Sequence, residues 1–177
     1  EWVEQGGTMV TLGSSTRWAA GSLAEIDLRA AEASDLSEEE RRRLGLRTTQ
    51  ERRSDAWDDA VTGIILPLTL DEDHPLAWGA GSGNEGASTF TLHLNDLALE
   101  PSASHETVAS FGESIDAVSG FVSEDKLEEI AASTWLSVAR VGSGKVIMFA
   151  DDPLFRLMWP ANFVLFTNAL LYGPRLR

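Results

Sequence analysis

The stretch 134–150 restricts the fold more than any other part of this sequence. Two apolar runs, 134–141 and 145–150, flank the turn residues Gly142, Ser143 and Gly144. Strand-forming runs separated by a short glycine-containing turn are typical of an antiparallel β-hairpin. The sequence therefore predicts that its last strands form a hairpin, which a helix then follows.

Helical structure is expected on both sides of Pro160. Asp151 and Asp152 suit the first turn of a helix, because carboxylates accept bonds from its free N–H groups, and Pro153 lacks such a group. Pro160 then begins a second helix that Gly173 and Pro174 end. One apolar stripe of this helix is predicted to pack against the sheet. The stripe contains Phe163, Phe166, Leu170 and Leu171, and Val164 and Leu165 widen it.

The first residues are typical of the middle of a domain. Residues 2–7 end in two glycines, as the last turn of a helix does, since glycine adopts the left-handed conformation there without strain. The apolar run 8–13 is predicted to be a strand buried on both faces, as in a parallel sheet. Because a domain seldom begins with a helix end, we expect a piece of a longer polypeptide, truncated at its N-terminus.

Composition sets the size of the fold and excludes several partners. With 177 residues, of which 43% are hydrophobic, the chain is predicted to form a single domain over 1–177. Its net charge of -14 disfavours nucleic acid and anionic membranes, since binding to phosphates depends on lysine and arginine. The absence of cysteine removes disulfides, thiolate metal sites and cysteine nucleophiles. No apolar run reaches the ~20 residues of a membrane span.

Residues 21–59 have few large apolar side chains and are rich in alanine, glutamate and arginine. Ser37 and Glu40 have the spacing of a capping box, in which each side chain bonds to the backbone N–H of the other residue. Glutamates four residues before Arg42 and Arg43 add helical ion pairs. We predict a helical or flexible insertion over 21–59, with a solvated helix that Gly45 ends.

The middle of the chain is predicted to hold three further strands and a short helix. The run 63–70 contains Pro67, which places it at a sheet edge or a bulge. In 89–94 the residues alternate, so that Phe90, Leu92 and Leu94 face inward and His93 outward. Weaker strand character covers 106–111, and Ser123 caps a helix over 123–130. The glycine-rich loop 78–86 lacks the Gly-Lys-Ser/Thr of a phosphate-binding loop.

Two groups of polar residues follow predicted strands. Ligands of open α/β sheets bind beyond the carboxyl ends of strands. For the serines, a helix cap is the preferred interpretation, and for the aspartates helix capping explains the residues equally well. The candidate ligand-binding residues are Ser14, Ser15 and Arg17 after the first strand, and Asp151, Asp152 and Arg156 after the last.

A metal site is not predicted. His93, Asp96 and His105 are of the residue types that bind zinc. However, His93 is expected to point outward from its strand and His105 to lie in a loop, so solvated or turn histidines are the better interpretation.

Four stretches of the sequence together have the pattern of a known family. They are Gly-Gly-Thr-Met-Val-Thr-Leu-Gly at 6–13, Asp-His-Pro-Leu-Ala-Trp-Gly at 73–79, Val-Gly-Ser-Gly-Lys-Val-Ile-Met-Phe-Ala-Asp-Asp-Pro at 141–153 and Asn-Ala-Leu-Leu-Tyr-Gly at 168–173. Over 1–13 and 64–173 the chain resembles a class I glutamine amidotransferase-like domain, as found at the C-terminus of bacterial zinc carboxypeptidases of the carboxypeptidase A type. The resemblance implies an α/β fold, a flavodoxin-like three-layer α/β/α sandwich with a mostly parallel sheet and a C-terminal antiparallel hairpin.

The resemblance implies no chemistry of its own for this chain. Amidotransferases of that superfamily use a cysteine, which is missing, and the stretch 12–16 holds only half of a Gly-x-Ser-x-Gly elbow. The His-x-x-Glu of the zinc peptidases is also missing, so zinc is expected in the N-terminal peptidase domain of the parent protein, and no cofactor here. We predict no catalytic residue, but a non-catalytic accessory domain of a metallopeptidase that packs on that domain or binds a partner or ligand.

Several alternatives remain open from the sequence. A serine-type hydrolase using Ser14 or Ser15 is one, and a small-ligand sensor that binds near Gly13 and Asp151 is another. The parent protein is expected to be secreted or periplasmic. The sequence leaves open whether the chain forms a homo-oligomer.

Overall fold

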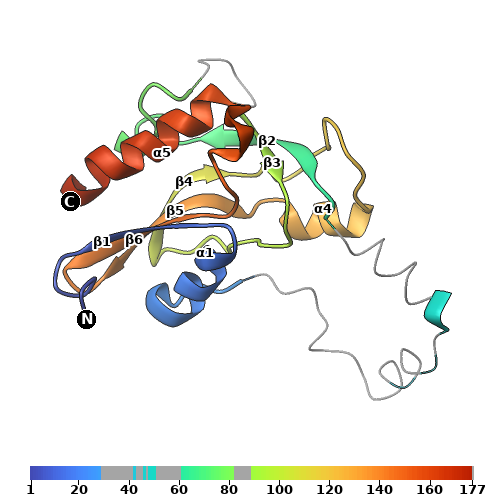
Figure 1. Cartoon of the computed structure of the whole chain (residues 1–177), viewed down its shortest axis with the longest axis horizontal. Coiled ribbons are helices and arrows are strands. Elements are labelled where there is room, and N and C mark those ends of the chain that lie inside the picture. Colours follow the sequence, from blue (N-terminus) through green and yellow to red (C-terminus); the bar gives the residue numbers. More distant parts are fainter. Residues whose placement is uncertain (29–41, 43–45, 47, 51–60, 82–88, 177) are drawn as a thin grey trace.

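A computed structural model describes residues 1–28, 42, 46, 48–50, 61–81 and 89–176. Its centre is a six-stranded sheet of the described residues, in the order β1-β6-β5-β4-β2-β3. The strands are β1 (Thr8–Leu12), β2 (Ile64–Leu70), β3 (Thr89–His93), β4 (His105–Ser110), β5 (Thr134–Val141) and β6 (Gly144–Phe149). Of the neighbouring pairs in this described sheet, β1 and β6 are parallel and all others antiparallel. The sheet is curled like half of a barrel (Figure 1).

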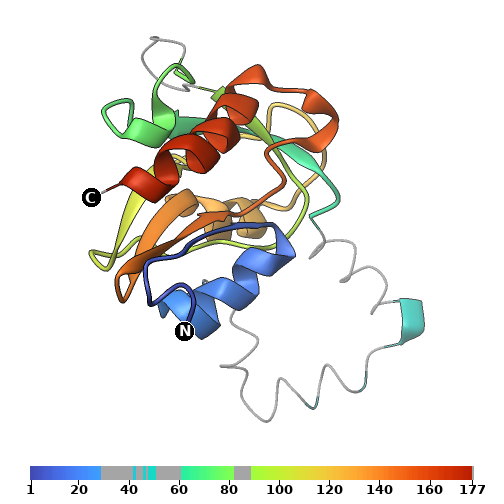
Figure 2. The same ribbon diagram turned by 60° about the vertical axis from the view of Figure 1, so that its left-hand side comes forward.

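Helices cover both faces of the curled sheet. On one face lie α1 (Ser14–Ala19) and the π-helix η1 (Ala20–Ala24), against β1, β5 and β6. On the other face lies α5 (Pro160–Tyr172), beside the short 3-10 helix η2 (Pro75–Ala77). Figures 1 and 2 show these two layers on opposite sides of the strands. The remaining helices are α4 (Glu124–Ile130), η3 (Phe155–Leu157) and η4 (Gly173–Arg175).

The predicted flavodoxin-like sandwich with a mostly parallel sheet is wrong. Parallel neighbours need a long crossover connection, whereas β5 and β6 are joined by a tight turn and pair antiparallel, as do β2 and β3. Continuous apolar runs indicate strands that are covered on both faces, and such strands are typical of a parallel sheet. Here the curled, largely antiparallel sheet has α1 and α5 on opposite faces, so its central strands carry the same pattern.

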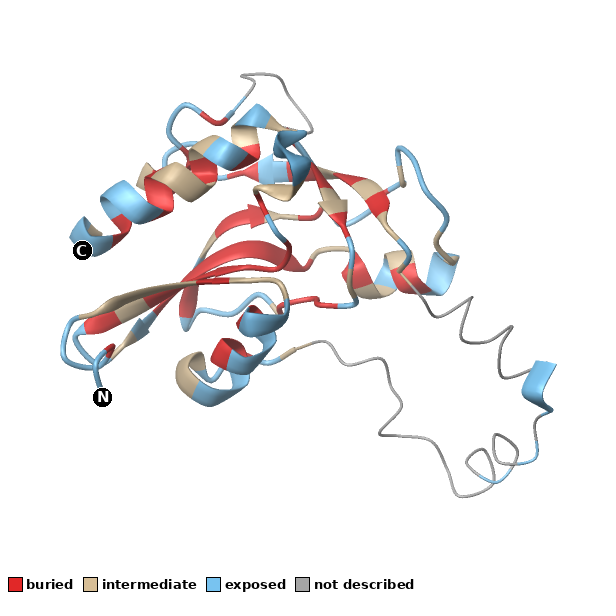
Figure 3. Ribbon diagram, viewed as in Figure 1, coloured by how far each residue is buried: buried red, intermediate tan, exposed pale blue. Residues whose placement is uncertain are grey.

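The predicted C-terminal hairpin is confirmed, and it forms the centre of the core. Val141 lies opposite Gly144, and Leu136 lies opposite Phe149. Gly142 has a φ of +62°, which favours glycine, and a Cβ there would lie 2.7 Å from the carbonyl oxygen of Glu4. Figure 3 shows the two strands almost wholly buried. The largest fully buried side chains of β5 and β6 are Trp135, Leu136, Ile147, Met148 and Phe149.

Helix α5 begins at Pro160 as predicted, but its buried face differs from the predicted stripe. Leu165 and Ala169 are buried, whereas Phe163, Leu170 and Leu171 are exposed to 48%, 53% and 56%. Two asparagines share the buried face and donate their amides to backbone carbonyls: Asn162 Nδ2 to Phe90, and Asn168 Nδ2 to Leu76 and Trp78. A hydropathy stripe ignores such bonds, so it placed Phe163, Leu170 and Leu171 wrongly. The rest of the predicted stripe is confirmed: Leu165 is buried, and Val164 and Phe166 pack partly buried against the core.

Strand β3 also has its faces reversed relative to the prediction. Thr91 and His93 are buried, while Phe90 and Leu94 are exposed to 36% and 40%. Hydrophobic alternation predicts the wrong face of a strand when the polar side chains on the other face have hydrogen-bond partners inside the protein. His93 has such a partner in Asp151, and the free energy of this hydrogen bond outweighs the exposure of Phe90.

The other local predictions have mixed outcomes. Strand β1 runs parallel to β6, and Ser123 Oγ accepts the Lys126 N–H at 3.3 Å, which confirms the cap of α4. Pro67 lies in β2 outside its pairing with β4, which covers only Thr69 and Leu70. The helix predicted from Ser37 to Gly45 falls outside the described residues, Arg42 excepted. Among the described helices, none has the length and apolarity to cross a membrane.

Candidate functional site

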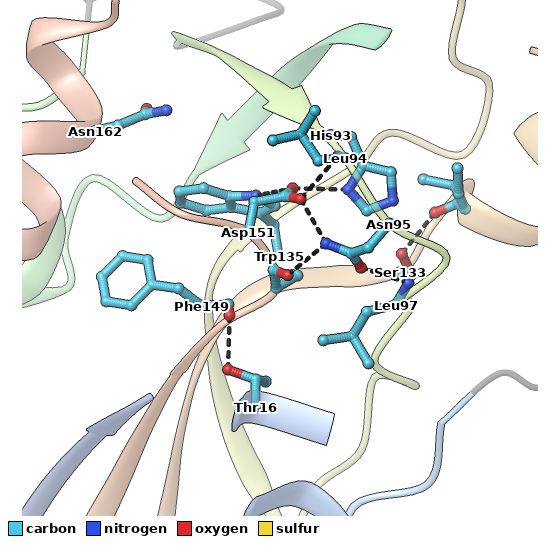
Figure 4. A network of polar contacts seen from close by, with 12 residues as sticks. Thr16, His93, Leu94, Asn95, Leu97, Ser133, Trp135, Phe149, Asp151 and Asn162 are labelled. Carbon is cyan, nitrogen blue, oxygen red and sulfur yellow. Dashed lines mark hydrogen bonds and ion pairs between the residues drawn. The ribbon is translucent and has the colours of Figure 1, made fainter. Parts of the chain in front are cut away.

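A buried carboxylate, that of Asp151, lies at the carboxyl end of β6 and is 1% exposed. Its Oδ1 accepts hydrogen bonds from the Leu94 N–H at 3.1 Å and from Asn95 Nδ2 at 2.8 Å. Its Oδ2 accepts bonds from His93 Nδ1 at 2.7 Å and from Trp135 Nε1 at 2.9 Å. Figure 4 shows these donors converging on the carboxylate. A buried carboxylate needs such donors, because they replace the water that it loses on folding.

His93 and Asp151 have two thirds of the groups of a Ser-His-Asp triad. The carboxylate orients the imidazole through Nδ1, as in the hydrolases, and Nε2 remains for a hydroxyl. Yet Nε2 is buried and has no hydrogen-bond partner among the described residues. The ring packs edge-on against Phe111, with 5.4 Å between centroids. The imidazole is therefore sealed from any substrate in this conformation.

Asp151 and its four donor residues, His93, Leu94, Asn95 and Trp135, are here called the Asp151 cluster. This cluster joins two distant parts of the sheet. His93 ends β3, whereas Asp151 follows β6, and the strand order places β5, β4 and β2 between them. Asn95 strengthens this junction by donating from Nδ2 to the Ala150 carbonyl at 3.0 Å and accepting the Leu97 N–H at 2.7 Å. Sequence reasoning missed Asn95 and Trp135. The only signal in the sequence was their position: Asn95 follows the predicted strand 89–94, and Trp135 lies near the start of the predicted strand 134–141.

The two serines of the predicted ligand site lie in the first turn of α1. The predicted serine cap is wrong, because the N-cap residue is Gly13, with no side-chain cap bond. Ser15 Oγ instead accepts the Leu12 N–H at 3.0 Å and donates to the Leu12 carbonyl at 2.8 Å. Within the described residues, no hydrogen bond links Ser14 or Ser15 to a histidine.

The next two residues of α1 are also bound within the protein. Thr16 Oγ1 donates to the Phe149 carbonyl at 2.7 Å and lies 3.0 Å from Thr11 Oγ1. Arg17, a predicted ligand residue, pairs with Asp96 at 2.7 Å, and both side chains are largely exposed. This pair occupies the carboxylate of Asp96, which is of a residue type that binds zinc.

The polar residues after β6 do not form one site. Asp151 was predicted to cap the following helix, and this is wrong, because its carboxylate bonds to the end of β3 and to Trp135. Asp152 Oδ1 accepts the Leu154 N–H at 2.9 Å. The Arg156 guanidinium lies 5.1 Å from the ring centroid of Phe155. Five of the six predicted ligand residues thus have internal contacts, and the Ser14 side chain makes no hydrogen bond within the described part of the chain.

The three histidines of the chain occupy three separate environments. His93 bonds to Asp151, and His74 Nε2 lies 3.1 Å from Glu106 Oε2. His105 is 7% exposed, and burial lowers its pKa below the usual value of 6.5. The interpretation of His93 and His105 as solvated or turn histidines is therefore wrong, because both are buried residues of strands. In the described part of the chain, no three His, Asp or Glu side chains gather as a metal-ligand set.

The fold has a distant counterpart among solved structures. No family model and no curated protein matches the sequence. The chain is similar to the structure called Cytoplasmic Protein STM3548 from Salmonella typhimurium, with 15% identity and a TM-score of 0.51. The match covers 97% of this chain and 57% of that one. At this identity the likeness concerns the fold alone.

Proposed function

We propose that this chain is a non-catalytic accessory domain of a larger, zinc carboxypeptidase-like protein, where it packs against the peptidase domain. The observation that supports this proposal is the burial of the Asp151–His93 pair, away from substrate and from any nucleophile of the described residues. An acyl-transfer site needs its base within hydrogen-bond reach of a nucleophile and of substrate. His93 Nε2 is buried and has no hydroxyl partner among the described residues. The pair stabilises the sheet and has no access to a substrate.

Exposed apolar side chains support the packing role. Phe163, Leu170 and Leu171, here called the α5 outer face, are exposed to 48%, 53% and 56%. Leu157 and Met158, just before this helix, are exposed to 67% and 47%. Clustered apolar side chains of this size on a folded surface favour contact with another protein surface. On the basis of the sequence resemblance, we propose that the peptidase domain of the same polypeptide covers this face.

A serine-directed fluorophosphonate tests the non-catalytic part of the proposal. We expect no labelling of Ser14 or Ser15, because Ser15 Oγ bonds to the backbone of Leu12 on both its donor and acceptor sides. Labelling that disappears in Ser15→Ala or Ser14→Ala would establish the serine hydrolase instead. Turnover of ester, peptide or glutamine substrates that depends on either serine would have the same meaning.

Hydrogen exchange tests the packing part. The chain alone and the full-length polypeptide are compared over α5, and slower exchange of its amides is expected in the full-length protein. Leu170→Glu should abolish that difference, whereas Val118→Glu, at another residue that is 63% exposed, should preserve it. Equal exchange of α5 in the two wild-type proteins would refute packing through this face.

A further inference from the structure

A cavity of about 310 Å³ lies where η2, β4 and the end of α5 meet. It is separate from the Asp151 cluster, and none of its lining residues was a predicted site residue. Its volume is at the lower end of the range for small-molecule sites. Five of the residues that line it have charged, polar or aromatic side chains that can bind a ligand: His74, Trp78, Glu106, Tyr172 and Arg175.

Two aromatic rings form a corner of the cavity. The centroids of Trp78 and Tyr172 are 5.9 Å apart, and their planes are inclined by 65°. Trp78 is fixed by its Nε1 bond to the Asp73 carbonyl at 3.3 Å, and its own carbonyl accepts Asn168 Nδ2 at 2.9 Å. Aromatic faces attract cations whose surface is apolar, because the ring quadrupole supplies the attraction and little hydration is lost.

Glu106 supplies an oriented negative charge. His74 Nδ1 accepts the Leu76 N–H at 3.1 Å, so the ring proton lies on Nε2, which donates to Glu106 Oε2 at 3.1 Å. Arg140 approaches the other oxygen of Glu106 only to 3.8 Å, and its side chain is 61% exposed. The carboxylate is thus held in place and keeps capacity for a further cationic partner.

Arg175 brings a positive charge to the same cavity. Its Nη1 donates to the Leu171 carbonyl at 3.4 Å, a long bond that leaves the other guanidinium donors for a ligand. A ligand with a single charge would cover one of the two charged groups without compensating it, which costs free energy. A ligand with both charges satisfies Glu106 and Arg175 together.

We propose that this cavity binds a small zwitterion that carries a quaternary ammonium group and a carboxylate, that is, a betaine. A primary ammonium needs three acceptors for its N–H groups. The cavity offers it one carboxylate and two aromatic rings, which suit a trimethylammonium group without N–H donors. The carboxylate of the ligand binds Arg175. This proposal does not depend on the accessory role of the chain.

Four ligands of nearly equal shape test the proposal by isothermal titration calorimetry on the whole chain. They are glycine betaine, with both charges, choline, with the ammonium only, 3,3-dimethylbutanoate, with the carboxylate only, and 3,3-dimethylbutanol, with neither. Glycine betaine should bind about tenfold more tightly than either singly charged ligand, a difference of about 1.4 kcal/mol in binding free energy.

Two variants assign each preference to its residue. Glu106→Gln should reduce the preference for glycine betaine over 3,3-dimethylbutanoate several-fold and leave the part that the rings of Trp78 and Tyr172 contribute. Arg175→Gln should reduce the preference over choline to near unity. Glu113→Gln and Arg156→Gln remove charges that do not line this cavity, and both preferences should persist in them.

Three results would overturn the proposal. The first is binding of 3,3-dimethylbutanoate as tight as that of glycine betaine, which would mean that the ammonium is not recognised. The second is absence of binding heat for glycine betaine up to about 10 mM, together with unshifted indole N–H resonances in NMR spectra at that concentration. The third is loss of both preferences in the Glu113 or Arg156 controls.

Discussion

His93 Nδ1 lies 2.7 Å from Asp151 Oδ2, and both side chains are fully buried. The bond joins the end of β3 to Asp151, two positions after the end of β6, although three strands separate β3 and β6 in the sheet. The curl of the sheet brings these ends together, and the four hydrogen bonds to the carboxylate hold them there. The cluster therefore stabilises the curl of the whole sheet.

Replacement of Asp151 should strongly destabilise the fold. Asp151→Ala leaves the Trp135 N–H and the His93 ring buried without their acceptor. Loss of a buried, multiply bonded charge is expected to lower the free energy of unfolding by about 3–5 kcal/mol. Asp152→Ala, which removes one exposed turn bond, should lower it by about 1 kcal/mol or less. Urea denaturation measures both, and equal losses would contradict the assigned role of Asp151.

His105 should make stability depend on pH. Burial lowers its folded pKa below 6.5, whereas the unfolded imidazole titrates near 6.5. Between those two pKa values the unfolded state binds more protons than the folded state. The free energy of unfolding therefore has its full value, as far as His105 is concerned, above pH 6.5, and it declines as the pH falls toward the folded pKa. His105→Phe should show a smaller loss of stability than the wild type between pH 7 and about 5.5 in urea denaturation. An unchanged loss in the variant would show that His105 is not responsible.

Asn168 should stabilise the contact between α5 and η2. Its Nδ2 donates to the carbonyls of Leu76 and Trp78, both at 2.9 Å. Asn168→Leu keeps the size of the side chain but leaves both carbonyls without this donor, so we expect a loss of about 1–3 kcal/mol. The neighbouring control Thr167→Ala removes an exposed bond to the Phe163 carbonyl and should change stability by about 0.5 kcal/mol or less. Thermal and urea unfolding decide between these values, and a stable Asn168→Leu protein would contradict this role.

Thr16 should stabilise the contact between α1 and β6. Its fully buried hydroxyl donates to the Phe149 carbonyl, which also accepts the Gly13 N–H at 3.0 Å. Thr16→Val preserves shape and removes the hydroxyl, so an unfolding free energy lower by about 1–2 kcal/mol is expected. Ser14→Ala, on the exposed side of the same turn, is the matched control, with an expected change of about 0.5 kcal/mol or less. Similar changes in both variants would argue against a special role for the Thr16 hydroxyl.

Local signals in the sequence predicted several elements well. The turn at Gly142 and Ser143 produced the hairpin, Pro160 begins α5, and Ser123 caps α4. Each of these depends on residues within a few positions of one another, so local backbone preferences suffice. The same signals could not distinguish a parallel sheet from a curled antiparallel one, because strands covered on both faces have the same composition in either.

By itself, the sequence indicated its strands, the turn at Gly142 and Ser143, and the helices α4 and α5, and it shows that this chain has no cysteine nucleophile. Only the tertiary structure decided which faces are inside and which polar groups meet. His93 and Asp151 are 58 positions apart, and Asn168 and Leu76 are 92 apart. Their hydrogen bonds outweigh the exposure of Phe90 and Leu170, because a buried polar group without a partner costs more free energy than a partly exposed apolar side chain. His93 and Asp151 meet across the curled sheet, and Asn168 reaches Leu76 where α5 packs beside η2. No local sequence pattern specifies either contact.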